Sequence, residues 1–134
     1  MSQENVEIVR RALEEFNELG FDGIGVSDLI ADDFEFHEPP EQPAPRVAVG
    51  REEARRLGRE FDAAWTEHTS VAEEIRAVDA DRVLSVTVER FKGRHGIQVE
   101  APLAAIFTLR DGKIIRYEAF WEKQNAFEAA GLPE

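Results

Sequence analysis

The chain has 134 residues, of which 43% are hydrophobic, so it is long enough for one domain with a buried core and too short for two. Its formal net charge of -12 argues against nucleic acid as a partner, because phosphate contacts need a basic surface. The absence of cysteine excludes disulfides, thiol chemistry and zinc sites with sulfur ligands. We therefore expect a single domain over residues 1–134.

The distribution of apolar residues does not suggest a membrane-spanning or secreted protein. There is no run of about 18 apolar residues, so we expect no membrane span. The opening MSQENVEIVRR carries acidic residues and has no apolar signal core. Cytoplasm is the expected location.

Apolar residues at three- and four-residue spacing predict helices in the first half of the chain. The apolar stripe of the first helix includes Val9 and Phe16, and the apolar stripe of the helix over 51–67 includes Phe61 and Trp65. The helices expected from this pattern, with a short one between the two long ones, lie over 2–19, 26–31 and 51–67.

Strand patterns surround and follow the third helix. Phe34–Glu38 alternates as a short strand, which Pro39 ends because proline cannot donate to a ladder. Asp111-Gly112 favours the positive backbone angles of a tight hairpin turn. Further strands, joined by hairpins into a largely antiparallel meander, are expected over 71–78, 82–91, 97–109 and 113–122, and a last short helix over 123–130.

Helices followed by a run of strands predict an α+β fold. We expect a cone-shaped, curved antiparallel sheet with three helices packed on its concave side, leaving a conical space between them. Residues of the helix stripes and of the concave strand faces should line that space.

The strand 113–122 should place Tyr117, Ala119 and Trp121 on one face, with Glu118 on the other. Aromatic residues in such positions are either ordinary core or the wall of a cavity. Tyr117 would bring the one phenol of the chain into that space, where it can donate to a carbonyl. The residues that we expect to contact a ligand are Phe16, Phe36, Phe61, Trp65, Val86, Val88, Tyr117 and Trp121.

Glu38 is the candidate catalytic residue. It shares strand parity with Phe34 and Phe36, which carries it to the pocket edge. A carboxylate beside apolar walls has a raised pKa and can move protons, whereas a solvated rim carboxylate cannot. Both interpretations stay open. The histidines His37, His68 and His95 are scattered, so we expect no metal site and no cofactor.

Three features together resemble a known family: Ala31-Asp32-Asp33 leading into a strand, the Glu38-Pro39 end of that strand, and the hairpin Asp111-Gly112-Lys113-Ile114. The chain resembles the nuclear transport factor two-like superfamily and, within it, the SnoaL-like group common in bacteria. The resemblance implies a cone-shaped α+β domain with a central pocket, dimerising through the outer sheet face. It does not imply one activity.

The chain is also similar in part to ketosteroid isomerases, which use a carboxylate base with two hydrogen-bond donors. The resemblance places the base at Glu38, but the two donor positions fall on Ala12 and Ala104. Losing one such donor costs about 3–4 kcal/mol of transition-state stabilisation. Similarity to SnoaL-type cyclases places their catalytic acid at Ala119, which also lacks the required group.

The residues leave three hypotheses of function open. The leading one is a protein that binds a small apolar molecule in an aromatic pocket. The second is an isomerase, polyketide cyclase or epoxide-hydrolase-like enzyme that uses Glu38 with Tyr117. The third is a non-catalytic domain that forms a homodimer through its sheet and has no cavity large enough for a ligand.

Overall fold

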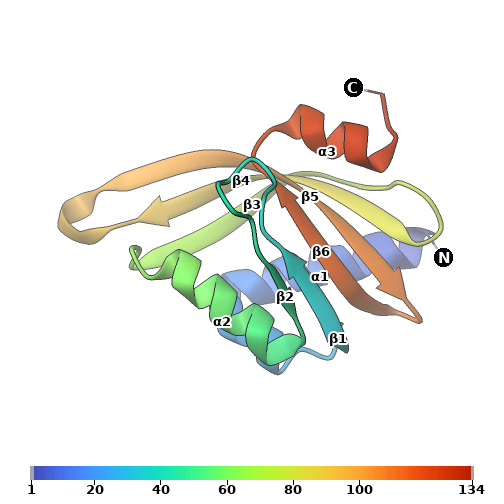
Figure 1. Cartoon of the computed structure of the whole chain (residues 1–134), viewed down its shortest axis with the longest axis horizontal. Coiled ribbons are helices and arrows are strands. Elements are labelled where there is room, and N and C mark those ends of the chain that lie inside the picture. Colours follow the sequence, from blue (N-terminus) through green and yellow to red (C-terminus); the bar gives the residue numbers. More distant parts are fainter. Residues whose placement is uncertain (1, 134) are drawn as a thin grey trace.

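The computed structural model describes residues 2–133 and has an α+β fold (Figure 1). No helix within 2–133 combines the length and the apolar character needed to cross a bilayer. The helical elements are α1 (Ser2–Leu19), the 3-10 helix η1 (Gly20–Gly25), α2 (Arg51–Asp62), the 3-10 helix η2 (Arg94–Gly96) and α3 (Lys123–Ala130). The strands are β1 (Ile30–His37), β2 (Val47–Val49), β3 (Glu67–Ala77), β4 (Arg82–Lys92), β5 (Gln98–Arg110) and β6 (Lys113–Phe120).

The sheet has six strands in the order β2-β1-β6-β5-β4-β3. Strands β3 to β6 form the predicted antiparallel meander, and β1 joins β6 in the one parallel pair among the described strands. The sheet is curved and open, with α1 and α2 on one face and α3 on the other (Figure 1). This arrangement confirms the predicted α+β cone.

The two faces of the sheet build two separate cores. On the concave side, Val9 of α1 and Val83 of β4 are fully buried in the larger core. On the convex side, Leu84 and Val86 of β4 pack with Phe127 of α3. Consecutive residues of β4 thus alternate between the cores, as a strand with two covered faces requires.

The β5–β6 hairpin turns at Asp111 and Gly112, whose φ angles are 52° and 78°, as predicted for a tight turn. Beyond the turn the register shifts, because Leu109 pairs with Ile114 whereas Thr108 pairs with Arg116. Ile115 is therefore the extra residue of a β-bulge. The bulge places Ile114 in the concave core, where strict alternation back from Tyr117 would place Ile115.

The short helix predicted over 26–31 is wrong. The 3-10 helix η1 ends before this segment, at Gly25. Strand β1 already begins at Ile30, which pairs with Ile114 of β6. The Arg51 guanidinium donates to the backbone carbonyls of Ile24, Ser27 and Ile30. These bonds give three backbone carbonyl groups of this non-helical segment a partner.

The helix α2 is shorter than predicted, because it ends at Asp62 and not near residue 67. The backbone N–H of Thr66 donates to the carbonyl of Lys92, and Glu67 pairs with Lys92 as β3 begins. Strand pairing with β4 therefore takes the residues that helical spacing alone assigned to α2.

Candidate functional site

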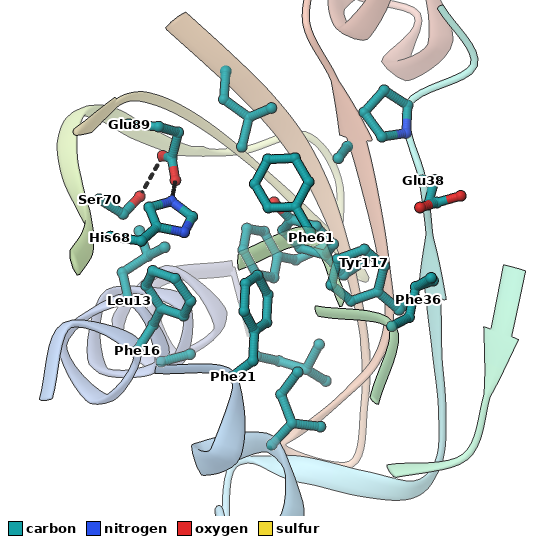
Figure 2. Close-up of a pocket in the computed structure, with 18 of the residues that line it drawn as sticks. Leu13, Phe16, Phe21, Phe36, Glu38, Phe61, His68, Ser70, Glu89 and Tyr117 are labelled. Carbon is teal, nitrogen blue, oxygen red and sulfur yellow. Dashed lines mark hydrogen bonds and ion pairs between the residues drawn. The ribbon is translucent and has the colours of Figure 1, made fainter. Parts of the chain in front are cut away.

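A cavity of about 140 Å3 lies between the helices and the concave face of the sheet. Its wall is built mainly of aliphatic and aromatic side chains (Figure 2). No Lys or Arg of the described residues 2–133 borders it. The aromatic residues of the wall include Phe16, Phe21, Phe36, Phe61, Tyr117 and Trp121.

Several elements bring a ring to this wall. Phe16 of α1 meets Phe21 of η1 edge to face, with ring centroids 4.9 Å apart. Phe36 of β1 lies 5.1 Å from Tyr117 of β6, because the two residues are paired across the parallel strands. Such offset and edge contacts are the favoured aromatic geometries. The rings therefore support one another around the cavity.

Phe21 reaches the cavity because α2 has no side chain at Gly58. A Cβ atom added to Gly58 would overlap the ring of Phe21. The helix and η1 can thus approach closely, and the aromatic ring fills the space that a side chain on α2 would occupy.

Five of the eight residues expected to contact a ligand border the cavity: Phe16, Phe36, Phe61, Tyr117 and Trp121. Val86 and Val88 do not border the cavity, so their predicted placement is wrong. They have the opposite strand parity to the residues of β4 that do. In β4 the odd-numbered positions face the concave side, and two of them, Glu89 and Phe91, border the cavity. A shift of one residue moves a whole strand pattern to the other face.

Trp65 also lies outside the cavity. It follows the end of α2, and its ring packs on Phe91 at a centroid distance of 5.0 Å and against Gly93. Because the helix stops at Asp62, Trp65 leaves the apolar stripe that had placed it inside.

Glu38 borders the cavity with part of its residue, but its carboxylate is directed away from the aromatic interior (Figure 2). Its Oε1 accepts hydrogen bonds from the backbone N–H and Nε of Arg46, and its Oε2 accepts one from Nη2. The carboxylate therefore holds the loop between β1 and β2, where Arg46 also contacts Glu60.

The three alanines that stand at the catalytic positions of the resembled enzymes do not all lie on one face of the sheet. Ala12 and Ala119 border the cavity. Ala104 does not, since it lies in the convex core beneath α3, and Leu103 is the β5 residue that lines the cavity here. None of these side chains can donate a hydrogen bond.

The most polar part of the wall was missed by the sequence interpretation. Nδ1 of His68 lies 2.9 Å from Oδ1 of Asp62, and Nε2 lies 2.7 Å from Oε1 of Glu89. The other oxygen of Glu89 accepts hydrogen bonds from the hydroxyls of Ser70 and Thr87. We call these five residues the His68 cluster (Figure 2 shows its part with His68, Ser70 and Glu89).

The cluster is deeply placed. The side chains of His68 and Glu89 are 6% and 4% exposed, whereas Asp62 is 24% exposed. Burial by itself lowers the pKa of His68, but the hydrogen bonds and charges of Asp62 and Glu89 outweigh it and raise the pKa to about 9. At neutral pH His68 is therefore an imidazolium held between two carboxylates. Four phenylalanine rings have their centroids 4.3–6.1 Å from it: Phe16, Phe21, Phe61 and Phe91.

A signal for this cluster is present in the sequence. Glu89 interrupts a strand whose other inward positions are Val83, Ser85, Thr87 and Phe91. An acidic residue at an inward position of a buried strand requires a partner. Its partner His68 lies 21 residues earlier and outside the preceding strand, predicted over 71–78, so parity alone could not identify it.

Tyr117 supplies a second polar group. It keeps accessible surface although protein encloses it, because that surface faces the cavity. Burial raises the pKa of Tyr117 far above its usual range, and the negative charge of Glu89 adds to the rise. The phenol is therefore a neutral hydroxyl, and we find no hydrogen-bond partner for it among residues 2–133. Within the same residues, no group of three or more Asp, Glu or His side chains is arranged to hold a metal ion.

The model of the SnoaL-like domain family matches residues 9–117 of the chain. The chain belongs to the SnoaL-like domain family. A comparison with curated protein sequences finds no match.

Solved structures share the fold of this SnoaL-like domain at low sequence identity. A protein from Jannaschia sp. CCS1 named as a SnoaL-like polyketide cyclase is 19% identical, with a TM-score of 0.73 and coverage of 99% of this chain and 95% of that one. A ketosteroid isomerase-like protein from Catenulispora acidiphila DSM 44928, solved with trimethylamine, is 17% identical, with a TM-score of 0.71 over 95% and 94% of the two chains.

An epoxide hydrolase-like protein from M. tuberculosis is similarly related, at 17% identity and a TM-score of 0.70 over 96% of this chain and 90% of that one. At such identities the likeness establishes the fold and not the activity. The fold is that of nuclear transport factor two-like and ketosteroid isomerase-like proteins.

Proposed function

We propose that this SnoaL-like domain binds one compact, mainly apolar molecule of about one ring in its central cavity. The observation that carries the proposal is the aromatic cavity of about 140 Å3. An apolar cavity of roughly 150 Å3 in another protein binds benzene, so the two sizes agree. Burial of apolar surface supplies the driving force.

The hydroxyl of Tyr117 gives this cavity a point of orientation. A neutral phenol without a protein partner can donate to an acceptor such as a ketone oxygen. An unpaired hydroxyl facing an apolar space loses its hydrogen bonds to water, and a ligand acceptor would restore one. We therefore expect the bound ring to carry an acceptor group near Tyr117.

The trimethylamine held by the related Catenulispora acidiphila protein supports the size that we propose, because it too is a compact molecule. A fused multi-ring substrate of the kind that polyketide cyclases process would exceed the cavity volume found here. The third hypothesis, a domain with no room for a ligand, is disfavoured by that same volume.

An enzyme that uses Glu38 receives little support from the geometry. Its carboxylate oxygens are engaged by Arg46, and a base must reach the proton that it removes. We propose that Glu38 stabilises the β1–β2 loop. Substitution Glu38→Gln should leave ligand affinity unchanged.

Calorimetric titration with a matched pair of compounds tests the proposal. Acetophenone and ethylbenzene have nearly the same shape, but only acetophenone has a carbonyl oxygen. We expect both to bind and acetophenone to bind about tenfold more tightly, as one additional hydrogen bond allows. In Tyr117→Phe the two affinities should become equal.

A filled cavity provides the control. Ala119→Leu adds apolar volume to the wall at a residue that is 4% exposed, and should abolish binding of both compounds while the circular dichroism spectrum stays native. Absence of binding to the unsubstituted protein would contradict the proposal. Equal binding by the Ala119→Leu variant would place the ligand elsewhere.

The homodimer and the cytoplasmic location stay predictions. Light scattering of the purified protein measures the first, and fractionation of cells that express the chain measures the second.

A further inference from the structure

The cavity wall contains one carboxylate with unused hydrogen-bonding capacity. An ionised carboxylate offers about four acceptor sites and donates nothing. Glu89 uses three of them, for His68, Ser70 and Thr87, and its Oε1 accepts only the bond from His68. Glu89 lines the cavity, so a ligand group that meets its carboxylate must be a donor.

The charge of the His68 cluster is not balanced. Asp62 and Glu89 each bring a carboxylate, and His68 brings one positive charge, so the cluster carries one excess negative charge. Among residues 2–133, the only other charged side chain that borders the cavity is Glu38, which is paired with Arg46 on its outer side. Apart from His68, no cation among residues 2–133 borders the cavity, so the excess negative charge of the cluster is not neutralised there.

Three further features agree with this sign. The negative charge of Glu89 adds to the rise in the pKa of Tyr117 that burial causes, so it disfavours a second negative charge in the cavity. The faces of aromatic rings also carry negative partial charge and attract cations within about 6 Å of the ring centre. A net charge of -12 on the whole chain would draw cations toward the protein.

We propose that the cavity selects a compact ring compound that carries a protonated amine, whose N–H donates to the carboxylate of Glu89. The inference rests on the proposed function and names the chemical class of its ligand. Loss of water around the ammonium opposes binding. A charge-assisted hydrogen bond and the aromatic faces offset that loss, whereas a carboxylate ligand would meet like charge in a poorly solvated space.

Three probes of similar size and different charge test the inference: benzylammonium, benzyl alcohol and benzoate, titrated by calorimetry at neutral pH and constant salt. We expect benzylammonium to bind about tenfold more tightly than benzyl alcohol, since hydrogen bonds to ionised donors are roughly twice as strong as neutral ones. Benzoate should show no binding.

Two substitutions in the same pair should act in opposite directions. Glu89→Gln removes the excess negative charge and should abolish the preference for benzylammonium over benzyl alcohol. His68→Gln removes the positive charge and should increase that preference. Because benzyl alcohol is neutral, its affinity in both variants reports whether the cavity has survived the substitution.

The outcomes separate the two proposals. Binding of benzyl alcohol that equals or exceeds that of benzylammonium would overturn the inference and leave the proposed function standing. Failure of all three probes to bind the unsubstituted protein would overturn both. If either variant does not fold, the three-probe series on the unsubstituted protein alone decides the question.

Discussion

Nε2 of His68 lies 2.7 Å from Oε1 of Glu89 in a cavity wall that is otherwise mainly apolar. Both side chains are almost fully buried, so neither charge has water to stabilise it. A buried ion pair adds little net stability relative to apolar residues, but removal of one partner leaves the other uncompensated. The pair therefore makes the stability of the fold depend on both residues.

Glu89→Ala should lower the free energy of unfolding by about 3–5 kcal/mol, because it leaves Nε2 of His68 and two buried hydroxyls without their acceptor. Urea denaturation measures the change. Glu100→Ala is the matched control on β5, since Glu100 is 61% exposed in its ion pair with Arg90 and should cost less than about 1 kcal/mol. The double variant His68→Leu with Glu89→Leu should be more stable than Glu89→Ala, and a lower stability would contradict this account.

The stability of the protein should fall as pH rises from about 6.5 to about 9. The pKa of His68 is higher in the folded protein than in the unfolded chain, so the folded state binds the proton more tightly. The stabilisation that comes from the raised pKa of His68 is complete below pH 6.5 and is lost as pH passes about 9. Its size is of the order of 3 kcal/mol. Urea midpoints across this range measure it, and His68→Gln should remove this part of the dependence. Asp62 and Glu89 are the charged groups that face His68.

Gly58→Ala should destabilise the protein by about 1–3 kcal/mol, although alanine is favoured over glycine inside helices by nearly 1 kcal/mol. The added methyl group overlaps the ring of Phe21, which must then move within the cavity wall. Gly25→Ala is the control, because its new Cβ would meet only ordinary contacts with the flexible Arg55 side chain. The midpoint temperature of thermal unfolding and the affinity for acetophenone should both decrease in Gly58→Ala. A Gly58→Ala variant that is more stable than the unsubstituted protein would show that the Phe21 ring moves aside without a free-energy cost.

Glu41→Ala should loosen the loop that covers one side of the cavity. The Glu41 carboxylate accepts hydrogen bonds from the backbone N–H groups of Trp121 and Glu122 and from Nδ2 of Asn125, at 3.2, 3.1 and 2.9 Å. Pro39 and Gln42 of the same loop line the cavity. We expect a loss of about 1 kcal/mol, typical of a lost hydrogen bond, and faster ligand dissociation in stopped-flow measurements.

Burial raises the pKa of Glu41, and the hydrogen bonds from Asn125, Glu122 and Trp121 more than offset this and lower it below 4.5. The contribution of Glu41 is therefore present above pH 4.5 and is lost as pH falls through the folded-state pKa. Glu14→Ala, at an exposed position of α1, is the control and should change neither stability nor dissociation. An unchanged dissociation rate in Glu41→Ala would show that the loop does not gate the cavity.

The sequence by itself determined the α+β fold, the antiparallel meander and the Asp111-Gly112 turn, because these depend on local spacing and on backbone angles that few residues adopt. It also placed Tyr117 and Phe36 correctly, since each belongs to a strand and follows a period of two. Trp121, just beyond the end of β6, keeps the parity of Tyr117 and also borders the cavity. It misplaced Val86 and Val88, because β4 is covered on both faces and its apolar residues do not reveal which parity faces inward.

Only the tertiary structure decided where the polar groups of the site lie. Glu38 shares the parity of the cavity residues, yet Arg46, eight positions away on a Pro-rich loop, draws its carboxylate outward. His68 and Glu89 meet because β3 and β4 pair antiparallel, a register that sequence spacing does not display. The need of a buried charge for a partner is physical and general, but the identity of that partner depends on which strands the chain brings together.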